Sequence, residues 1–148
     1  MSEPVIRLTD PSDKAAWVRL FAAYREFYQQ PADDAVVQRV WSWILDPQHE
    51  TYCVVAEIDE VIVGIADYRV YARPLAGATG IWLDDLFTDP DYRGHGIGRS
   101  LIEYLQSLAR QQGHSIVRWT TAEDNKTAQR LYDTIATRTT WVTYDATP

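Results

Sequence analysis

The sequence predicts an α/β domain over residues 1–148, with an antiparallel set of strands followed by a parallel strand–helix–strand unit. Three observations predict it: two segments with helical apolar spacing follow a short first strand, strand-like segments come next, and a glycine-rich loop then joins a strand to a helix. The resulting order is β-α-α-β-β-β-α-β-α-β. We find no repeat or linker that divides the chain, so a single domain is expected.

Two helices are expected near the N-terminus, after a short strand over residues 5–9. Asp10-Pro11-Ser12-Asp13 supplies capping oxygens and an early proline, which is typical of a helix start. Pro31 is expected to end this helix, and a second helix is predicted over residues 33–45. The apolar faces of the two helices consist of Trp17, Leu20, Phe21, Tyr24, Tyr28, Val36, Val37, Val40, Trp41 and Ile44.

The period of the apolar pattern changes in the middle of the chain. Residues 52–58 and 61–68 are rich in apolar and β-branched side chains and flank a turn at Asp59-Glu60, which predicts a β-hairpin. The elements expected after the hairpin are a strand over 81–88, a helix over 96–112, a strand over 115–121, a helix over 125–136 and a last strand over 139–144.

Charge and composition exclude several classes of protein. The chain has 14 basic and 21 acidic residues, a formal net charge of −7 and no basic run, so nucleic acid is not an expected partner. A hydrophobic content of 46% excludes a disordered chain. No apolar run is long enough to span a bilayer, and the first residues lack a signal-peptide pattern. We therefore expect a cytoplasmic protein that does not bind membranes.

Disulfide and metal chemistry are not expected. Cys53 is the only cysteine, so no disulfide can form within the chain and no cysteine cluster can bind a metal. His49, His95 and His114 are scattered, and none has a second ligand at metal-binding spacing. The sequence therefore predicts no metal site.

The most informative segment is the loop Arg93-Gly94-His95-Gly96-Ile97-Gly98, between an expected strand and an expected helix. Glycines let the backbone approach a ligand, and the first amides of a helix are unpaired and lie at the positive end of its dipole. Arg93 and Arg99 add positive charge to an otherwise acidic protein. The segment therefore predicts a site for a polyphosphate ligand.

Two common nucleotide-binding loops do not match these residues. A Walker loop requires a lysine and then Ser or Thr after its last glycine, whereas Gly98 is followed by Arg99-Ser100. A dinucleotide-binding loop would have a further glycine at position 99 and an acidic residue at the end of the next strand, where Trp119-Thr120-Thr121 stands. A glycine-rich turn that only connects strand to helix is the other alternative. Three glycines in five residues, flanked by two arginines, argue against it.

The wider segment 85–98 resembles the signature of the GNAT acetyltransferases, (Arg/Gln)-x-x-Gly-x-(Gly/Ala), with Arg93, Gly96 and Gly98 at its fixed positions. The similarity continues downstream at Asn125, Ala128, Leu131 and Tyr132. It implies a mixed, largely antiparallel sheet of about six to seven strands with four helices, in which two central parallel strands splay apart. Residues 119–121 and 141–144 resemble the polyamine- and histone-acetyltransferase-like branch, although Asp133-Thr134 replaces the Gly-Phe that often follows Leu-Tyr.

The resemblance implies acetyl-CoA as the cosubstrate. The diphosphate would lie on backbone amides of the loop, and the pantetheine arm would pair with the preceding strand edge as an added strand. The backbone N–H of Leu86 matches the position that polarises the thioester carbonyl. The residues that the resemblance assigns to this site are Leu86, Phe87, Thr88, Arg93, Gly94, His95, Gly96, Ile97, Gly98, Arg99, Ser100 and Asn125. For Asn125, capping of the following helix is the alternative.

Three side chains are candidate catalytic residues. Tyr132 matches the tyrosine of the family's Leu-Tyr pair, and a phenol with a pKa of about 10 can give a proton to a leaving thiolate. Packing in the core is the alternative for Tyr132. Asp84 and Asp85 interrupt an apolar strand, and strand alternation predicts that they point to opposite faces.

Asp84 is expected beside the reacting carbonyl, where it would hold a cationic amine and relay its proton through water. The pair Asp84-Asp85 resembles the Glu-Asp pair of polyamine and thialysine acetyltransferases, with the shorter Asp in place of Glu. A salt bridge at a strand end is the alternative. Four aromatic residues on the two N-terminal helices are candidates for the wall of an acceptor pocket, with core packing as their alternative: Tyr24, Tyr28, Trp41 and Trp43.

The expected function is transfer of an acetyl group from acetyl-CoA to a primary amine of a polyamine, diamine or lysine-like acceptor. The acidic balance favours a cationic small molecule or a basic peptide as the partner. Two alternatives stay open: a non-catalytic module that binds acetyl-CoA as a sensor, and an enzyme that acetylates protein N-termini or lysines. The resemblance also suggests a homodimer.

Overall fold

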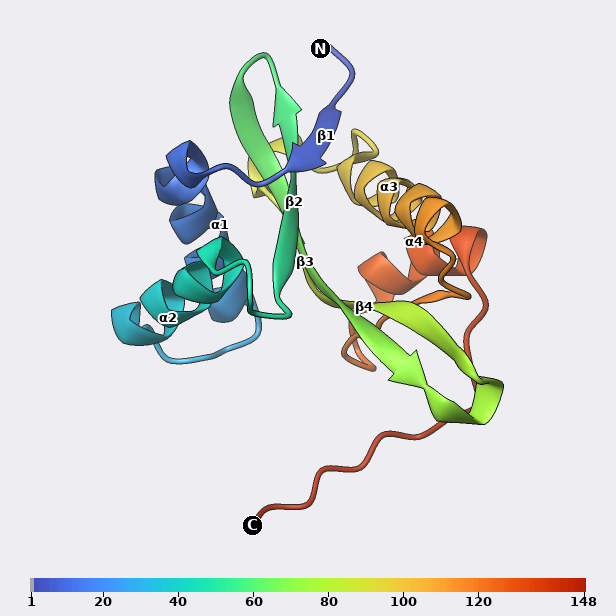
Figure 1. Ribbon diagram of the computed structural model, residues 1–148. Helices are drawn as coiled ribbons and strands as arrows, with labels where there is room; N and C mark the ends of the chain where they lie inside the picture. The colour runs from blue at the N-terminus through green and yellow to red at the C-terminus, as the bar shows by residue number, and fades with distance from the viewer. Residues whose placement is uncertain (1) are drawn as a thin grey trace.

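A five-stranded sheet separates two pairs of helices in the computed structural model, which describes residues 2–148 (Figure 1). The helices are α1 (Lys14–Phe27), α2 (Asp34–Leu45), α3 (Ile97–Gln112) and α4 (Lys126–Ile135). The strands are β1 (Val5–Leu8), β2 (Tyr52–Ile58), β3 (Val61–Arg73), β4 (Ala78–Thr88) and β5 (Val117–Arg118). Within the described residues, no helix has the length and apolar character needed to cross a membrane.

The strands lie in the sheet in their chain order, β1-β2-β3-β4-β5. Neighbours from β1 to β4 are antiparallel, and β5 runs parallel to β4. α1 and α2 lie on one side of the strands, and α3 and α4 lie on the other (Figure 1). This arrangement confirms the predicted α/β fold with its antiparallel front, its parallel unit and its four helices.

The sheet of residues 2–148 has five strands, fewer than the six to seven that were expected. β3 and β4 are longer than the strands expected over 61–68 and 81–88, and they pair as a hairpin that was not predicted. The strand expected over 115–121 is reduced to Val117–Arg118. The strand expected over 139–144 is wrong, because those residues form neither helix nor strand. A strand requires a neighbour that accepts its backbone hydrogen bonds, and none in the described chain pairs with this segment.

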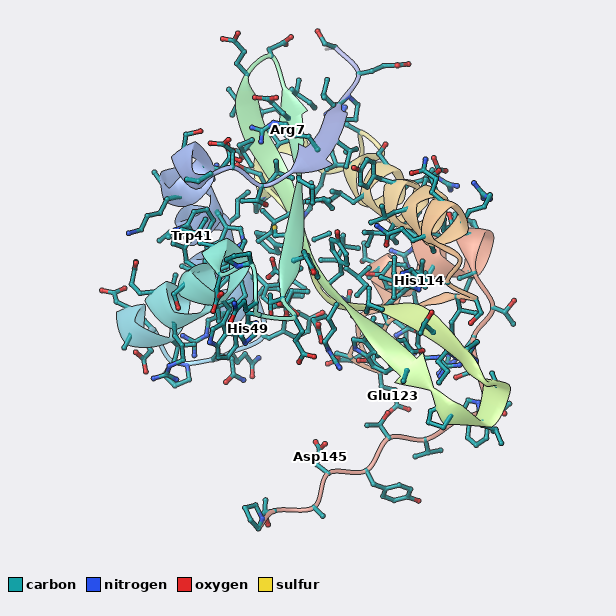
Figure 2. All side chains as sticks on the ribbon, viewed as in Figure 1. Arg7, Trp41, His49, His114, Glu123 and Asp145 are labelled. Atoms are coloured by element: carbon teal, nitrogen blue, oxygen red, sulfur yellow. The ribbon has the colours of Figure 1, made fainter. Side chains whose placement is uncertain are left out.

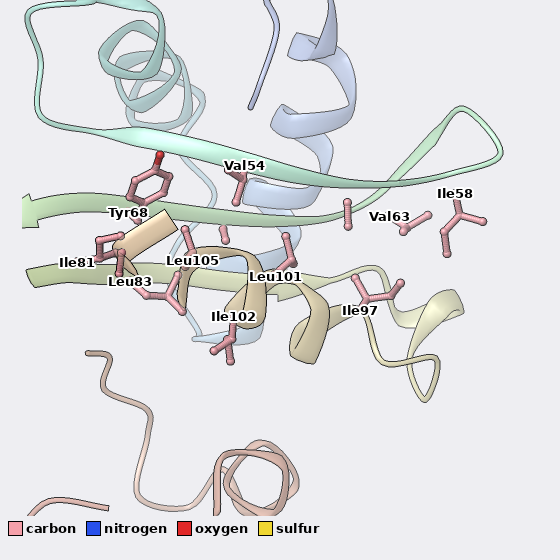
Figure 3. Packing of buried hydrophobic residues seen from close by; sticks show 13 residues of the cluster. Val54, Ile58, Val63, Tyr68, Ile81, Leu83, Ile97, Leu101, Ile102 and Leu105 are labelled. Atoms are coloured by element: carbon pink, nitrogen blue, oxygen red, sulfur yellow. The ribbon is translucent and has the colours of Figure 1, made fainter. Parts of the chain in front are cut away.

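One core cluster joins α3 to the sheet (Figure 3). Ile97, Leu101 and Leu105 of α3 are buried against apolar side chains of β2, β3 and β4. The first turn of α3 packs on Gly64 of β3, where an added Cβ would lie 2.7 Å from Ile97 Cγ2. This contact fixes the first turn of α3 beside the sheet.

A second cluster holds α1 and α2 against the other face. Trp17 of α1 is fully buried and stacks on Phe21, with ring centroids 4.6 Å apart, while Trp41 of α2 packs against Trp17. The cluster includes Phe87 at the end of β4, and the ring of Tyr24 lies 6.1 Å from the Phe87 ring. Tyr24 of α1 is thereby brought to the end of β4.

Candidate active site

A β-bulge in β4 places two aspartates on one side of the sheet. The register with β3 shifts between Asp67 and Tyr68, so that Asp84 is the extra residue of β4 and Asp85 lies opposite Asp67. Asp84 forms an ion pair with Arg69, which shares a face with Asp67 because the two are two residues apart on β3. The expectation that Asp84 and Asp85 point to opposite faces is therefore wrong, because the bulge interrupts the alternation.

β4 and β5 separate after a short parallel contact. Ile81 and Trp82 pair with Val117 and Arg118, and the pairing ends there. From Leu83 to Thr88, β4 has no strand beside it on that side within residues 2–148. This confirms the expected splay of two parallel strands and leaves a free strand edge next to the glycine loop.

The loop after β4 is anchored at its start and open at its glycines. The Asp89 side chain accepts hydrogen bonds from the backbone N–H of Asp91 (3.0 Å) and from Arg19 Nη1 (2.9 Å). Gly94 and Gly96 have φ angles of 80° and 76°, in the left-handed region that favours glycine. A Cβ at either glycine would meet no heavy atom within 4 Å, so the conformation, not the packing, requires glycine.

α3 begins directly after this loop. Gly96 is its N-cap residue, and no side chain caps the helix there. The first amides of α3 therefore have no partner within the helix and lie at the positive end of its dipole. The Arg93 guanidinium lies over the rings of Phe27 (5.7 Å) and Phe87 (5.5 Å), and Arg99 donates a hydrogen bond to Thr134 Oγ1 (3.0 Å).

These elements enclose a large cleft with a volume of about 560 Å³. Its lining consists of Phe27, Tyr28, Leu86, Phe87, Thr88, Tyr92, Arg93, Gly94, Gly96, Ile97, Gly98, Arg99, Asn125, Thr127, Ala128, Leu131 and Tyr132. The residues that the resemblance assigns to acetyl-CoA are all among them, except His95 and Ser100. His95 is exposed to solvent, and the Ser100 amide donates to Gly96 O within the helix (3.0 Å).

A small cleft of about 20 Å³ adjoins the large one. It is lined by Tyr24, Tyr28, Leu83, Asp84, Leu86, Trp119, Thr120 and Tyr132. Tyr28, Leu86 and Tyr132 line both clefts, so the two clefts meet at these residues. A group in the large cleft can therefore reach a group in the small cleft between the splayed strands.

Tyr132 of α4 lies at this junction. Its ring packs edge-on against Trp119, with centroids 5.3 Å apart. Burial, with a smaller effect of Tyr28, raises the pKa of Tyr132 to about 12, so the phenol is protonated at neutral pH and can donate a proton. Asn125 caps α4, because its side chain accepts a hydrogen bond from the backbone N–H of Ala128 (3.3 Å).

Asp84 lines the small cleft and forms an ion pair with Arg69. Arg69 Nε donates to Asp84 Oδ2 at 3.2 Å, and the Arg69 guanidinium lies 5.7 Å from the centroid of the Trp82 ring. Partial burial raises the pKa of Asp84, and Arg69 acts in the opposite direction. The Asp84 carboxylate can therefore attract a cation and accept a proton from it.

A buried aspartate that the sequence did not reveal lies beside Asp85. Asp67 is 1% exposed; Trp17 Nε1 donates to its Oδ1 (3.2 Å), while its Oδ2 has no hydrogen-bond partner among the described residues. Burial and the Asp85 carboxylate raise the pKa of Asp67 well above its ordinary value. Asp67 and Asp85 are register partners on β3 and β4, so a proton on Asp67 relieves the repulsion between the two carboxylates. Burial, followed by Asp85, also raises the pKa of the Tyr24 phenol.

The remaining histidines and the cysteine lie outside both clefts. His49 stacks on Trp43 (4.8 Å), and His114 contacts Thr79 Oγ1 (2.8 Å); Figure 2 shows the two histidines on different sides of the molecule. Cys53 is buried in β2, and burial raises the pKa of its thiol, which keeps it protonated. These residues contribute to packing.

Comparison with protein families decides the assignment. The family described as "Acetyltransferase (GNAT) family" matches residues 17–135, which include both clefts and the loop before α3. The chain belongs to the GNAT family. The resemblance inferred from the segment 85–98 is thereby confirmed.

Relatives of this GNAT protein are N-acetyltransferases. It is 28% identical over 142 residues to the D-amino-acid N-acetyltransferase HPA3 of Saccharomyces cerevisiae, covering 95% of this chain and 88% of that one. It is 33% identical over 95 residues to the thialysine N-epsilon-acetyltransferase of Sus scrofa, covering 59% and 55%. Among solved structures, AAC(6')-Iy in complex with the bisubstrate analogue CoA-S-monomethyl-acetylneamine has the same fold, with a TM-score of 0.80 at 19% identity over 99% of both chains.

This GNAT protein is therefore an acetyl-CoA-dependent N-acetyltransferase. Its large cleft fits that cosubstrate. The open space in front of Gly94 and Gly96 leaves room for a diphosphate against the backbone, and the free amides of α3 supply donors. The volume also lies within the range of about 300–1,000 Å³ that is typical of ligand sites.

Proposed function

We propose that the enzyme acetylates a primary amine of a small cationic acceptor, such as a polyamine, a diamine or a lysine-like molecule. The observation that carries this proposal is the small cleft, where Asp84 lies among Tyr24, Tyr28, Trp119 and Tyr132. A carboxylate attracts an ammonium group, and aromatic faces attract cations and pack on methylene chains. The net charge of −7 also favours a cationic acceptor.

In this proposal acetyl-CoA occupies the large cleft, with its acetyl group at the junction of the two clefts. The backbone of residues 93–99 holds the diphosphate, and the edge over residues 86–88 pairs with the pantetheine arm. The lining of the cleft, the free edge of β4 and the uncapped start of α3 support this placement. His95 and Ser100 have no side-chain role in it, because neither lines the cleft.

Acetyl-CoA supplies a thioester, so the nitrogen of the neutral amine bonds to the acetyl carbon as the carbon–sulfur bond breaks; the nitrogen then loses one proton to solvent, and the thiolate gains one. A free primary amine has a pKa of about 10.4 and is protonated at neutral pH, so a group must also remove one proton before the attack. We assign this role to Asp84, directly or through a water molecule. Tyr132 gives the proton to the thiolate, and its place at the junction supports that role. Asp85 lines neither cleft and acts as a positioning residue beside Tyr24.

Arg69 favours a second class of acceptor, namely amino acids with a free carboxylate. Its Nε lies 3.2 Å from Asp84, so an anion and a cation stand side by side at the small cleft. The ammonium and carboxylate groups of an amino acid complement such a pair. The similarity to a D-amino-acid N-acetyltransferase supports this second candidate.

A thiol-release assay with acetyl-CoA and one amine at a time tests the proposal. The panel contains diamines, polyamines, lysine, D-amino acids and a lysine-containing peptide. The highest kcat/KM is expected for a cationic small amine, while a preference for D-amino acids would select the second candidate. Turnover of the peptide alone would indicate protein acetylation. Binding of acetyl-CoA without turnover of any amine would indicate a sensor module and refute the proposal.

The Tyr132→Phe variant tests the proposed acid. The variant should lose about 10²-fold or more in kcat, because general acid catalysis typically contributes about 10²–10⁴. Its affinity for acetyl-CoA should change little. Tyr68→Phe is the matched control, since burial also raises the pKa of Tyr68 to about 12 but its side chain lines neither cleft. Wild-type kcat in Tyr132→Phe would remove Tyr132 from the mechanism.

A further inference from the structure

Asp67 is a buried acid that the chemistry proposed above does not use. It is 1% exposed and lies in an otherwise apolar part of β3, residues 61–68. Its Oδ1 accepts a hydrogen bond from Trp17 Nε1 (3.2 Å), and its Oδ2 has no partner among the described residues. An apolar side chain would fill the same space without burying a polar atom, so packing alone does not account for a carboxyl group at this position.

Three titratable side chains surround Asp67, and each belongs to a different element. Cys53 of β2 and Asp85 of β4 are its register partners, and Tyr24 of α1 is the third, because both carboxyl groups act on its phenol. The ion pairs among residues 2–148 include neither Asp67 nor Asp85. Two neighbouring carboxyl groups without a cation cannot both ionise easily, so the pair keeps one proton.

The hydrogen bonds around Asp67 indicate which atom carries this proton. Oδ1 already accepts from Trp17, and the Cys53 thiol donates to the carbonyl oxygen of Val54 (3.4 Å). Oδ2 is therefore the atom left to carry the proton, and the Asp85 carboxylate on the neighbouring strand is its acceptor. Such a hydrogen bond from a carboxylic acid to a carboxylate is charge-assisted and holds both groups in place.

Asp85 connects this pair to the small cleft through Tyr24. Burial, followed by the charge of Asp85 and a hydrogen bond with it, raises the pKa of the Tyr24 phenol, as expected when the hydroxyl donates to the carboxylate. Tyr24 lines the small cleft, whereas Asp67 and Asp85 line neither cleft. A hydroxyl that donates its only proton to Asp85 keeps its oxygen lone pairs free to accept an N–H group in the cleft.

We propose that Asp67 is a positioning residue for the acceptor amine: its proton holds the Asp85 carboxylate, Asp85 holds the Tyr24 hydroxyl, and the Tyr24 oxygen accepts a hydrogen bond from the amine. An amine that donates one N–H to Tyr24 is held in one orientation, which leaves its lone pair available for the thioester. No proton is transferred along these groups, so Asp84 and Tyr132 keep the roles assigned above. This inference rests on the proposed function.

Two substitutions of Asp67 separate hydrogen-bond donation from packing. Leucine has a similar size but cannot donate, whereas asparagine can donate through its NH₂ group. Asp67→Leu should lower kcat/KM for the amine about three- to tenfold, the effect of one hydrogen bond, and leave the Kd of acetyl-CoA unchanged. Asp67→Asn should recover the kcat/KM that Asp67→Leu loses. Val37→Ala, a core substitution on α2 that lies outside both clefts, controls for lost stability and should keep the wild-type kcat/KM.

A double-mutant cycle shows whether Asp67 acts through Tyr24. Tyr24→Phe should lower kcat/KM at least as much as Asp67→Leu does, and the variant with both substitutions should be no worse than Tyr24→Phe alone. Losses that multiply in the double variant would overturn the proposal. Wild-type kcat/KM in Asp67→Leu, or an Asp67→Asn variant as impaired as Asp67→Leu, would also overturn it.

Infrared spectroscopy tests the proton itself and does not depend on the folding of the leucine variant. The difference spectrum between the wild type and Asp67→Asn at neutral pH should contain the C=O stretch of an un-ionised carboxylic acid. If the wild type acetylates amines but this band is absent, the role of Asp67 is refuted and the proposed function stands. If the wild type acetylates no amine, the proposed function fails, and the role of Asp67 fails with it.

Discussion

Replacing Asp67 by asparagine should make the protein more stable at neutral pH. The folded chain keeps the Asp67 proton, because burial and the Asp85 carboxylate raise its pKa, whereas the pKa in the unfolded chain is about 3.9. As the pH rises above this lower value, the unfolded chain loses the proton first. The free energy of unfolding therefore falls by up to about 1.4 kcal/mol for each pH unit until the pKa of the folded chain is passed. Asparagine has no such proton to lose.

The geometry around Asp67 accommodates the amide. Oδ1 of the asparagine can still accept the hydrogen bond from Trp17 Nε1, and its NH₂ replaces Oδ2, which lacks a partner among residues 2–148. That NH₂ group can donate toward Asp85, the register partner of residue 67 on β4. Cys53, its register partner on β2, is unchanged by the substitution. At neutral pH we therefore expect the free energy of unfolding of Asp67→Asn to be higher than that of the wild type by more than about 1 kcal/mol.

Urea unfolding between about pH 4.5 and about pH 8 measures this difference. The difference in free energy of unfolding between Asp67→Asn and the wild type should grow as the pH rises and then level off. Asp133→Asn makes the same substitution at an exposed position on α4 and is the control; it should change the free energy of unfolding at neutral pH by less than about 0.5 kcal/mol. Parallel curves for Asp67→Asn and the wild type would show that folding does not raise the pKa of Asp67, and a loss of stability at every pH would show that the site does not accommodate the amide; either result would refute the prediction.

Two further substitutions test other parts of the account. Asp84→Asn should lower kcat/KM for a cationic amine at least tenfold and flatten the acidic limb of the pH profile of kcat/KM, because the proposed base is lost. The control Asp59→Asn, in the β2–β3 turn, should keep the wild-type kcat/KM and the wild-type pH profile. A wild-type pH profile in Asp84→Asn would contradict the assignment of Asp84. Gly64→Ala should lower the free energy of unfolding by about 1–3 kcal/mol, because the added Cβ would lie 2.7 Å from Ile97 Cγ2. An unchanged midpoint of urea unfolding would refute the close packing of Ile97 on Gly64.

The order and approximate bounds of the elements could be predicted from the sequence because their apolar periodicity coincides with burial. Residues 52–58 and the helix after the glycine loop show this most clearly. The far end of the β3–β4 hairpin could not be predicted, because its strands are paired there but largely exposed and lack an apolar pattern. The composition of residues 139–144 predicts a strand, yet composition cannot supply a neighbour to pair with.

The candidate site could be predicted where its residues are contiguous in the sequence, as in the glycine loop and the segment around Tyr132. Asp67 and Arg69 could not be placed, because their roles depend on the register of β3 with β4 and on the bulge at Asp84. The available signal was a lone acidic residue, Asp67, in the apolar run 61–68. For Tyr24 the sequence left open whether it packs in the core or lines an acceptor pocket; in the structure it lines the small cleft.

The most direct test of the site is calorimetric titration of acetyl-CoA into the wild type, Gly96→Ala and Gly77→Ala. Gly96 and Gly77 have φ angles of 76° and 60°, and neither has a heavy atom within 4 Å of an added Cβ. Both substitutions therefore impose a similar strain of about 1–2 kcal/mol, but Gly77 lies in the β3–β4 turn, outside both clefts. The wild type and Gly77→Ala should bind equally, and Gly96→Ala should bind about tenfold more weakly. An absence of binding heat with the wild type, or an equal loss of affinity in both variants, would contradict a diphosphate-binding site on the loop before α3.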